Sequence, residues 1–216
     1  MTDMPFDPLS KPALAESIAL QLLKSPAFSF PPEGKIAGAG IYALYYSGDF
    51  PAYQPIAKKN KGAKPPIPIY VGKAVPKGSR KGGVGLESKP GSALFARLLK
   101  HAHSIESVSN LNLEDFRYRY VICEDVWITF CETMLIIRFR PLWNVFVEGF
   151  GINVPGAGRE KQRKSMWDTL HPGRPEARKL PPNDKSAAEL EELVAEFFAG
   201  KIAPKVGAAE AAAMRG

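Results

Sequence analysis

The stretch GIYALYY at residues 40–46 predicts a β-strand, because isoleucine, leucine and tyrosine suit a pleated, half-buried surface. A second stretch, IYVGKA at residues 69–74, has a similar composition and the same signal. Each includes a tyrosine close to a glycine, Tyr42 in the first stretch and Tyr70 in the second. We expect the two strands to be neighbours, so that both hydroxyls meet over one face of a sheet.

The connection between these strands is unusually long. Tyr42 and Tyr70 lie 28 positions apart (70 − 42), and the residues between them include PAYQPIAKKNKGAKPPIPI. Proline and lysine dominate this segment, and both are typical of surface connections. We therefore predict an inserted loop at residues 47–66.

Hydrophobic periodicity predicts a small α/β (α+β) fold, with a mixed or antiparallel sheet of about three strands covered by helices. We divide the chain into an N-terminal helical extension (1–37), a core (38–148) and a basic loop with a C-terminal helix (149–216). Ser92 and Asp125 are the expected caps of two helices. The expected strands are 40–46, 67–71 and 116–123, and the expected helices are 13–23, 94–103, 126–139 and 186–198.

Arg97 and His101 lie four positions apart, so they project from one face of the predicted helix. Arg97 can fork onto a phosphate and stabilise its developing negative charge. His101 can accept a proton from Tyr42 or fix the tyrosine hydroxyl. The alternatives are a surface phosphate clamp or a solvated residue for Arg97, and an ordinary core or surface residue for His101.

Glu132 interrupts the apolar run VWITFCETMLII. Its helical neighbours are Ile128, Leu135 and Ile136, so the face around this carboxylate is apolar. An ionised carboxylate there must be paired, exposed or bound to a metal. A single carboxylate suits Mg²⁺, which keeps most of its water and accepts phosphate oxygens as further ligands. The alternative is a structural salt bridge, for instance to Arg97.

Six residues in this order, Tyr42, Tyr70, Arg97, His101, Glu132 and Asn144, resemble the site of the GIY-YIG nucleases. The match covers residues 38 to 146, and its departure is the long distance between the tyrosines. The insertion and the following YVGKAVPKG resemble the GIY-YIG restriction endonucleases that cut CCGCGG. The resemblance implies a sequence-specific type II DNA endonuclease that uses Mg²⁺, with Mn²⁺ able to substitute. It also implies a homodimer on double-stranded DNA and a cognate DNA methyltransferase in the same system.

The resemblance also assigns roles. Tyr42 would activate the attacking water and Tyr70 would position water or phosphate, while Lys73 would supply a nearby cation. Glu132 would hold a metal that stabilises the leaving 3′ oxygen. Asn144 would hydrogen-bond backbone near the site and hold the helix of Glu132. Ordinary strand positions for the tyrosines, and a loop cap for Asn144, remain open alternatives.

The net charge of +7 and the isoelectric point near 9.4 favour a polyanionic partner. The basic residues cluster in three segments that contain few acids, a pattern typical of a surface that follows phosphates, although solvated loops would give the same pattern. The candidate DNA contacts are Lys58, Lys59, Lys61, Lys77, Arg80, Lys81, Arg159, Arg163, Lys164, Arg174 and Arg178. Their arginines are candidates for forked contacts to guanine.

Two other classes of function compete with a nuclease. One is a DNA-binding protein of the same fold that cleaves nothing, which the complete set of site residues argues against. The other is a basic RNA-associated protein, and the basic segments lack the aromatic residues typical of a single-strand platform.

Cys123 and Cys131 lie eight positions apart (131 − 123), without metal or redox spacing, and are expected to be buried thiols. The N-terminus shows no secretion signal, and the longest apolar stretch is too short to span a bilayer. We expect a soluble, cytoplasmic protein with no membrane partner.

Overall fold

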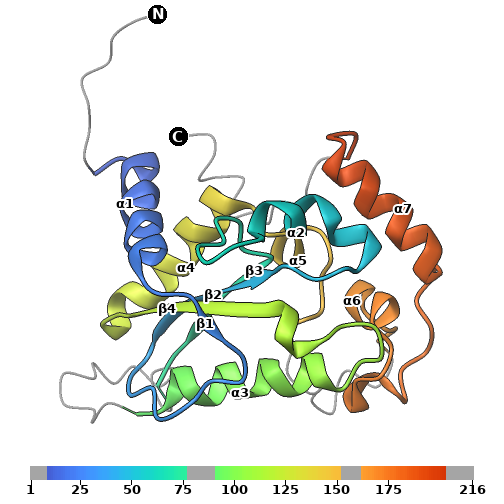
Figure 1. Ribbon diagram of the computed structural model, residues 1–216, viewed down its shortest axis with the longest axis horizontal. Helices are drawn as coiled ribbons and strands as arrows, with labels where there is room; N and C mark the ends of the chain where they lie inside the picture. The colour runs from blue at the N-terminus through green and yellow to red at the C-terminus, as the bar shows by residue number, and fades with distance from the viewer. Residues whose placement is uncertain (1–8, 77–90, 152–161, 203–216) are drawn as a thin grey trace, which may run out of the picture.

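A computed structural model describes residues 9–76, 91–151 and 162–202 (Figure 1). Its centre is a four-stranded antiparallel sheet in the order β1-β4-β2-β3. This confirms the predicted fold class, with one strand more than expected. The additional strand, β1 (Phe28–Ser29), pairs with β4 at the sheet edge, and two residues are too few to produce a period-two signal. The remaining strands are β2 (Gly40–Tyr46), β3 (Tyr70–Ala74) and β4 (Phe116–Ile122).

Alternation along β2 divides its side chains between two cores. Tyr42, Leu44 and Tyr46 belong to a core that is shared with α3 (Ala93–Glu106). Ile41, Ala43 and Tyr45 belong to a core that is shared with α1 (Lys11–Lys24) and α4 (Asp125–Phe139). We call these sides the α3 face and the α4 face; the helices flank the sheet on opposite sides (Figure 1).

The predicted inserted loop is wrong in part, because half of it is helical. It forms a 3₁₀ turn, η1 (Pro51–Tyr53), and a helix, α2 (Gln54–Asn60). A proline stands in the first turn of each, where its missing N–H costs no hydrogen bond. Tyr53 and Ile56 are buried, and the Asn60 side chain holds the backbone of Tyr46 and Ile67. Proline content signalled a loop where it in fact starts helices.

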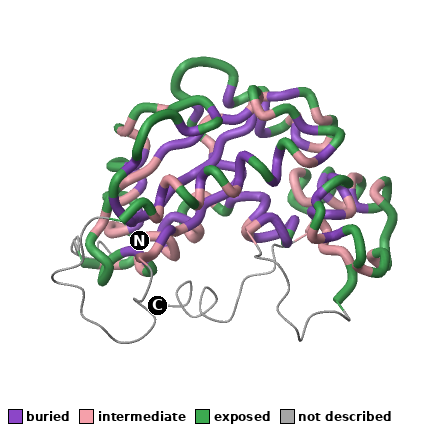
Figure 2. Tube along the Cα trace, turned by 90° about the horizontal axis from the view of Figure 1, so that it is seen from below, coloured by how far each residue is buried: buried purple, intermediate pink, exposed green. Residues whose placement is uncertain are grey.

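The chain beyond α4 packs on the α3-side core. Trp167, Leu170, Leu190 and Val194 are buried in it, and Figure 2 shows buried segments continuing from the sheet into this region. Ser186 and Glu189 form a capping box at the start of the last helix. The elements of this part are α5 (Leu142–Val145), α6 (Met166–Leu170), η4 (Pro175–Ala177) and α7 (Ala187–Phe198). A further 3₁₀ turn, η3 (Leu113–Asp115), lies directly before β4.

The long helices lie within three residues of the predicted ranges, but some local predictions are wrong. Ser92 is the N-cap residue as predicted, although its side chain makes no cap hydrogen bond, and Asp125 is the first helical residue rather than the cap. Cys123 and Cys131 are half-buried rather than buried. No helix in the described ranges is long and apolar enough to cross a membrane.

Candidate active site

The two tyrosines meet on the α3 face. Tyr42 pairs in register with Gly72, and the ring centroids of Tyr42 and Tyr70 are 6.3 Å apart. A Cβ atom at position 72 would collide with the Tyr42 hydroxyl and crowd the Tyr70 ring. The glycine two residues after Tyr70 is therefore needed because both phenols occupy the space above it. Sequence reasoning predicted the meeting of the tyrosines but gave no reason for this glycine.

Arg97 and His101 converge on the Tyr42 hydroxyl from α3, as their spacing predicts. The Tyr42 oxygen lies 2.6 Å from His101 Nε2 and accepts a hydrogen bond from Arg97 Nε at 3.3 Å. Burial, followed by the positive charges of Arg97, Lys100 and Arg174, holds the pKa of His101 well below its usual value. A neutral imidazole accepts a proton at one nitrogen, so the Tyr42 O–H can donate to Nε2.

The buried Tyr42 hydroxyl does not lose its proton easily. Burial, together with the nearby Tyr70 hydroxyl, raises its pKa well above the ordinary value, although the charge of Arg97 acts in the opposite direction. Free phenolate is therefore scarce at neutral pH. The hydroxyl can act as a base only if its own proton moves to His101 as it takes another.

Tyr70 is enclosed by aromatic and basic groups. Its ring packs edge-on against Phe150, with centroids 5.1 Å apart, and its hydroxyl lies near Arg97 and Tyr42. Burial raises the pKa of Tyr70, while the charge of Arg97 lowers it. A Cβ atom at Gly151 would strike the Tyr70 hydroxyl, so the chain passes directly over this phenol.

Glu132 reaches the site from the other face. Its carboxylate pairs with Lys73 Nζ at 2.7 Å, not with Arg97, and the two side chains are 19% and 34% exposed, with Lys73 the more open. Lys73 alternates with Tyr70 and Gly72 along β3, which places it on the α4 face. Even so, the negative charge of Glu132 raises the pKa of both Tyr42 and Tyr70. The carboxylate is therefore within electrostatic range of both phenols.

The surroundings of Glu132 fit a hard cation that takes few ligands from the protein and keeps most of its water. Among the described residues, no group of three His, Cys, Asp or Glu side chains could enclose a metal. One carboxylate that is open to water suits Mg²⁺, which retains water ligands and completes its shell with phosphate oxygens. A zinc-type cage of protein ligands does not fit this part of the chain.

Asn144 supports β3 rather than the helix of Glu132. Its Oδ1 accepts from the Val71 N–H at 2.8 Å, and its Nδ2 donates to the Val71 carbonyl at 2.8 Å. β3 is an edge strand of the sheet, so these backbone groups have no strand to pair with. Asn144 thus fixes the strand between Tyr70 and Gly72, and the predicted contact to the Glu132 helix is wrong.

Sequence reasoning missed Phe150 and Gly151. The Phe150 ring stacks on the His101 imidazole with centroids 4.6 Å apart and planes 19° apart. The Gly151 carbonyl accepts from Arg97 Nη2 at 2.8 Å. The Gly-Phe-Gly triplet at 149–151 was the available signal, because glycines flanking an aromatic residue indicate a close approach of backbone.

The predicted DNA contacts fall into three groups. Lys58, Lys59, Lys61, Arg163 and Arg178 are exposed and Lys164 is half-buried, while Lys77, Arg80, Lys81 and Arg159 lie outside the described residues. Arg174 does not fit the prediction, because it is 7% exposed and its guanidinium is bound to Asp168 and to two backbone carbonyls. A count of charges cannot distinguish a solvated arginine from a buried, paired one.

Comparison with known families agrees with this geometry. The sequence model of the Eco29kI GIY-YIG domain matches residues 34–198, which is 165 of 216 residues (198 − 34 + 1). Eco29kI recognises CCGCGG. No curated protein matches the chain at a significant level. The match starts before β2 and ends with α7, so it includes all six residues of the predicted constellation, and the chain belongs to the Eco29kI family of GIY-YIG restriction endonucleases.

Proposed function

We propose that this protein is a Mg²⁺-dependent type II restriction endonuclease that hydrolyses phosphodiester bonds in double-stranded DNA. The observation that carries the proposal is the hydrogen-bonded set of Tyr42, Arg97 and His101, with the Glu132 carboxylate close by. Each member of the set has a chemical task in phosphodiester hydrolysis.

Proton transfer would run through Tyr42. The attacking water gives its proton to the Tyr42 oxygen while the Tyr42 proton passes to His101 Nε2 across the 2.6 Å hydrogen bond. The depressed pKa of His101 keeps its imidazole neutral and ready to accept. Coupling both transfers avoids a free phenolate, which the buried surroundings disfavour.

Arg97 and Glu132 would act on the phosphate. The guanidinium of Arg97 is a planar fork that matches two phosphate oxygens, so substrate would replace part of its present hydrogen bonding. Glu132 would hold the cation, and its pairing with Lys73 would loosen as it does so. Mg²⁺ bound there would supply positive charge to the phosphate and to the leaving 3′ oxygen.

The target would be a palindrome, with CCGCGG as the specific expectation. One site of this kind cuts one strand, so a double-strand break requires two subunits, and a two-fold dimer fits a palindromic sequence. Exposed arginines such as Arg163 and Arg178 are candidates for guanine contacts. A methyltransferase of the same specificity would protect the host DNA in the cytoplasm.

The test is incubation of a plasmid carrying many candidate sites with the protein and either Mg²⁺, Mn²⁺ or a chelator. Discrete fragments whose ends map to CCGCGG, formed only with a metal, are the expected result. Discrete fragments at a different palindrome would correct the specificity alone. Tight binding to a DNA duplex without cleavage would indicate a DNA-binding protein that does not cleave. A preference for RNA over DNA would refute the proposed function.

A further inference from the structure

Residues 149–151 form a strap over the catalytic cluster. Phe150 stacks on His101 and packs edge-on against Tyr70. The next carbonyl, at Gly151, accepts from Arg97. The strap therefore contacts all three of these side chains, and a displacement of the strap would change the position of each.

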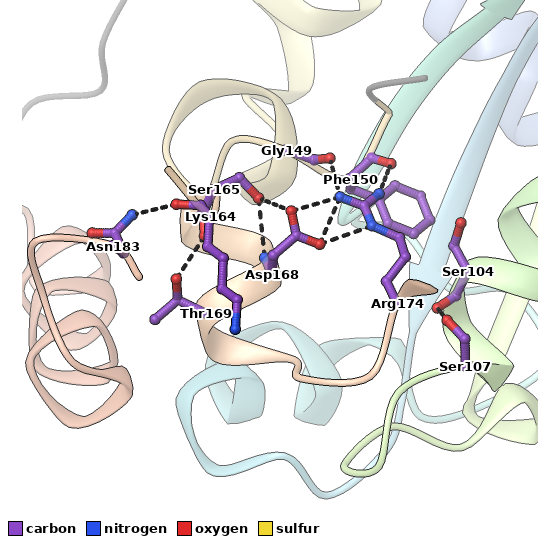
Figure 3. Close-up of polar contacts among 10 residues, drawn as sticks. All are labelled: Ser104, Ser107, Gly149, Phe150, Lys164, Ser165, Asp168, Thr169, Arg174 and Asn183. Carbon is purple, nitrogen blue, oxygen red and sulfur yellow. Dashed lines mark hydrogen bonds and ion pairs between the residues drawn. The ribbon is translucent and has the colours of Figure 1, made fainter. Parts of the chain in front are cut away.

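A buried ion pair holds the strap (Figure 3). Arg174 donates from Nε and Nη2 to the two carboxylate oxygens of Asp168, both at 2.8 Å. The same guanidinium donates from Nη1 to the Phe150 carbonyl at 3.1 Å and from Nη2 to the Gly149 carbonyl at 3.0 Å. Asp168 is fixed in turn by the Ser165 hydroxyl, whose oxygen lies 2.6 Å from the carboxylate.

The contacts that Arg174 makes with Asp168 and with the strap require an arginine. We call the Arg174–Asp168 pair the clamp. Only a planar fork can bind a carboxylate with two donors and still reach two carbonyls, and Arg174 also lies 4.9 Å over the Trp167 ring. Gly149 is equally constrained, since its φ is +120° and a Cβ atom there would collide with the Ser165 side chain. Strap and clamp thus fit each other closely.

We propose that Arg174, oriented by Asp168, is a positioning residue of the nuclease, which holds the strap so that Phe150 fixes His101 and the Gly151 carbonyl fixes Arg97. The inference rests on the proposed function of that cluster. Arg174, which the sequence predicted to contact DNA, would thus have a role that depends on its burial.

The charge of Arg174 adds a second, measurable effect. Arg97, Lys100 and Arg174 are the cations that lower the pKa of His101 after burial, and Tyr42 and Tyr70 are the other titratable groups facing the ring. Removing the charge of Arg174 should raise the pKa of His101. A proton acceptor must be neutral, so the acid limb of the rate profile should move to higher pH.

The experiment compares Arg174→Met with Arg119→Met. Arg119 is a matched control, because it is 2% exposed, lies 4.7 Å over the Tyr45 ring and donates to two carbonyls, those of Ser25 and Pro65. Neither of its carbonyl partners contacts the catalytic cluster. Melting curves set a working temperature at which both variants are folded, and then kcat, KM for a cognate duplex and the pH profile are measured.

We expect Arg174→Met to lower kcat by about 10²-fold with little change in KM, because misplacing catalytic groups by about 1 Å has that effect. Arg119→Met should stay within about threefold of wild type. Arg174→Lys restores the charge without the fork, so its acid limb should return toward wild type while kcat recovers only in part. Equal losses in both methionine variants, without a change of pH profile, would overturn the inference.

Two further measurements cover the remaining outcomes. If Arg174→Met does not fold, Phe150→Leu tests the strap directly, and an unchanged kcat in that variant would overturn the inference. NMR titration of the His101 imidazole compares the wild type with Arg174→Lys or Arg174→Met. This measurement does not depend on DNA cleavage. If the wild-type protein cuts no DNA, the proposed function is refuted. If the pKa of His101 is the same with and without a positive charge at position 174, only the electrostatic part of the inference is refuted.

Discussion

The two faces of the sheet carry two parts of the site that differ in how completely they are built. On the α3 face, Tyr42 and His101 are 0% and 2% exposed and already hydrogen-bonded to each other. On the α4 face, Glu132 and Lys73 form an ion pair that is open to water.

The difference matches the chemistry proposed for each part. Proton transfer needs fixed distances, which a dry, aromatic-lined cluster supplies before substrate arrives. Metal binding needs a carboxylate that can exchange partners, which a half-exposed ion pair allows because such pairs contribute little to stability. Substitutions on the α3 face should therefore change rate, and those on the α4 face should change the dependence on metal.

Glu132→Gln should have the largest effect. The substitution keeps helix and size but removes the carboxylate proposed to bind the metal, so cleavage should fall by more than about 10³-fold while duplex binding remains. Glu16→Gln is the matched control, since Glu16 also pairs with a basic residue, Arg138, away from the site. Gel shift and single-turnover cleavage measure the two properties, and activity of Glu132→Gln within about tenfold of wild type would remove the metal assignment.

Arg97→Lys should lower the rate by about 10²-fold to 10³-fold, although the charge is kept, because the fork onto phosphate is lost. Arg117→Lys provides the comparison, because the Arg117 guanidinium donates to a backbone carbonyl, that of Gly62, away from the site. A mild effect on rate with a large rise in KM would assign Arg97 to phosphate binding instead.

Tyr42→Phe deletes one oxygen and should lower kcat by about 10²-fold, the size expected for loss of a general base. Tyr45→Phe is the control on the same strand, since Tyr45 is equally buried but points to the α4 face. Both variants should melt near the wild-type temperature. Equal rates for the two phenylalanine variants would show that Tyr42 takes no proton.

The α3 face should also be the acid-sensitive one. Burial lowers the pKa of His101 well below 6.5 and that of His171 to about 3, so between these values and 6.5 the unfolded chain binds protons that the folded chain does not. Stability is therefore complete above pH 6.5 and falls as the pH drops, by up to about 1.4 kcal/mol per pH unit for each histidine. Urea unfolding at several pH values measures the slope, which His171→Gln should reduce and the exposed His103→Gln should not.

Much of the α3 face could be predicted from the sequence. Its tyrosines lie in stretches of high strand propensity, and Arg97 and His101 are close enough along one helix for spacing to fix their side. The partner of Glu132 could not be predicted, because Lys73 on β3 and Glu132 on α4 are far apart in the sequence and no local rule connects the two elements.

The remaining misses share a physical cause. Arg174, Asp168 and the 149–151 strap acquire their roles through contacts between segments without periodicity. Charge and glycine content describe each segment alone, whereas burial depends on what packs against it. The helix α2 was missed for the same reason, since a composition typical of loops was overridden by the burial of Tyr53 and Ile56.

Lys73→Met should have the smallest effect and bears most directly on the comparison of faces. Lys73 Nζ lies 2.7 Å from Glu132 Oε2 and competes with a cation for that carboxylate. Removing the amine should lower the Mg²⁺ concentration needed for half-maximal cleavage by about threefold to tenfold, a difference of about 1 kcal/mol that suits a partly exposed pair. The maximal rate at saturating Mg²⁺ should change little if Lys73 only holds the carboxylate until metal arrives. Lys58→Met, an exposed lysine on α2, controls for loss of positive charge on DNA binding. A lower maximal rate with an unchanged Mg²⁺ requirement would instead make Lys73 part of the rate-determining machinery, and the two faces would then no longer divide into a chemical part and a metal part.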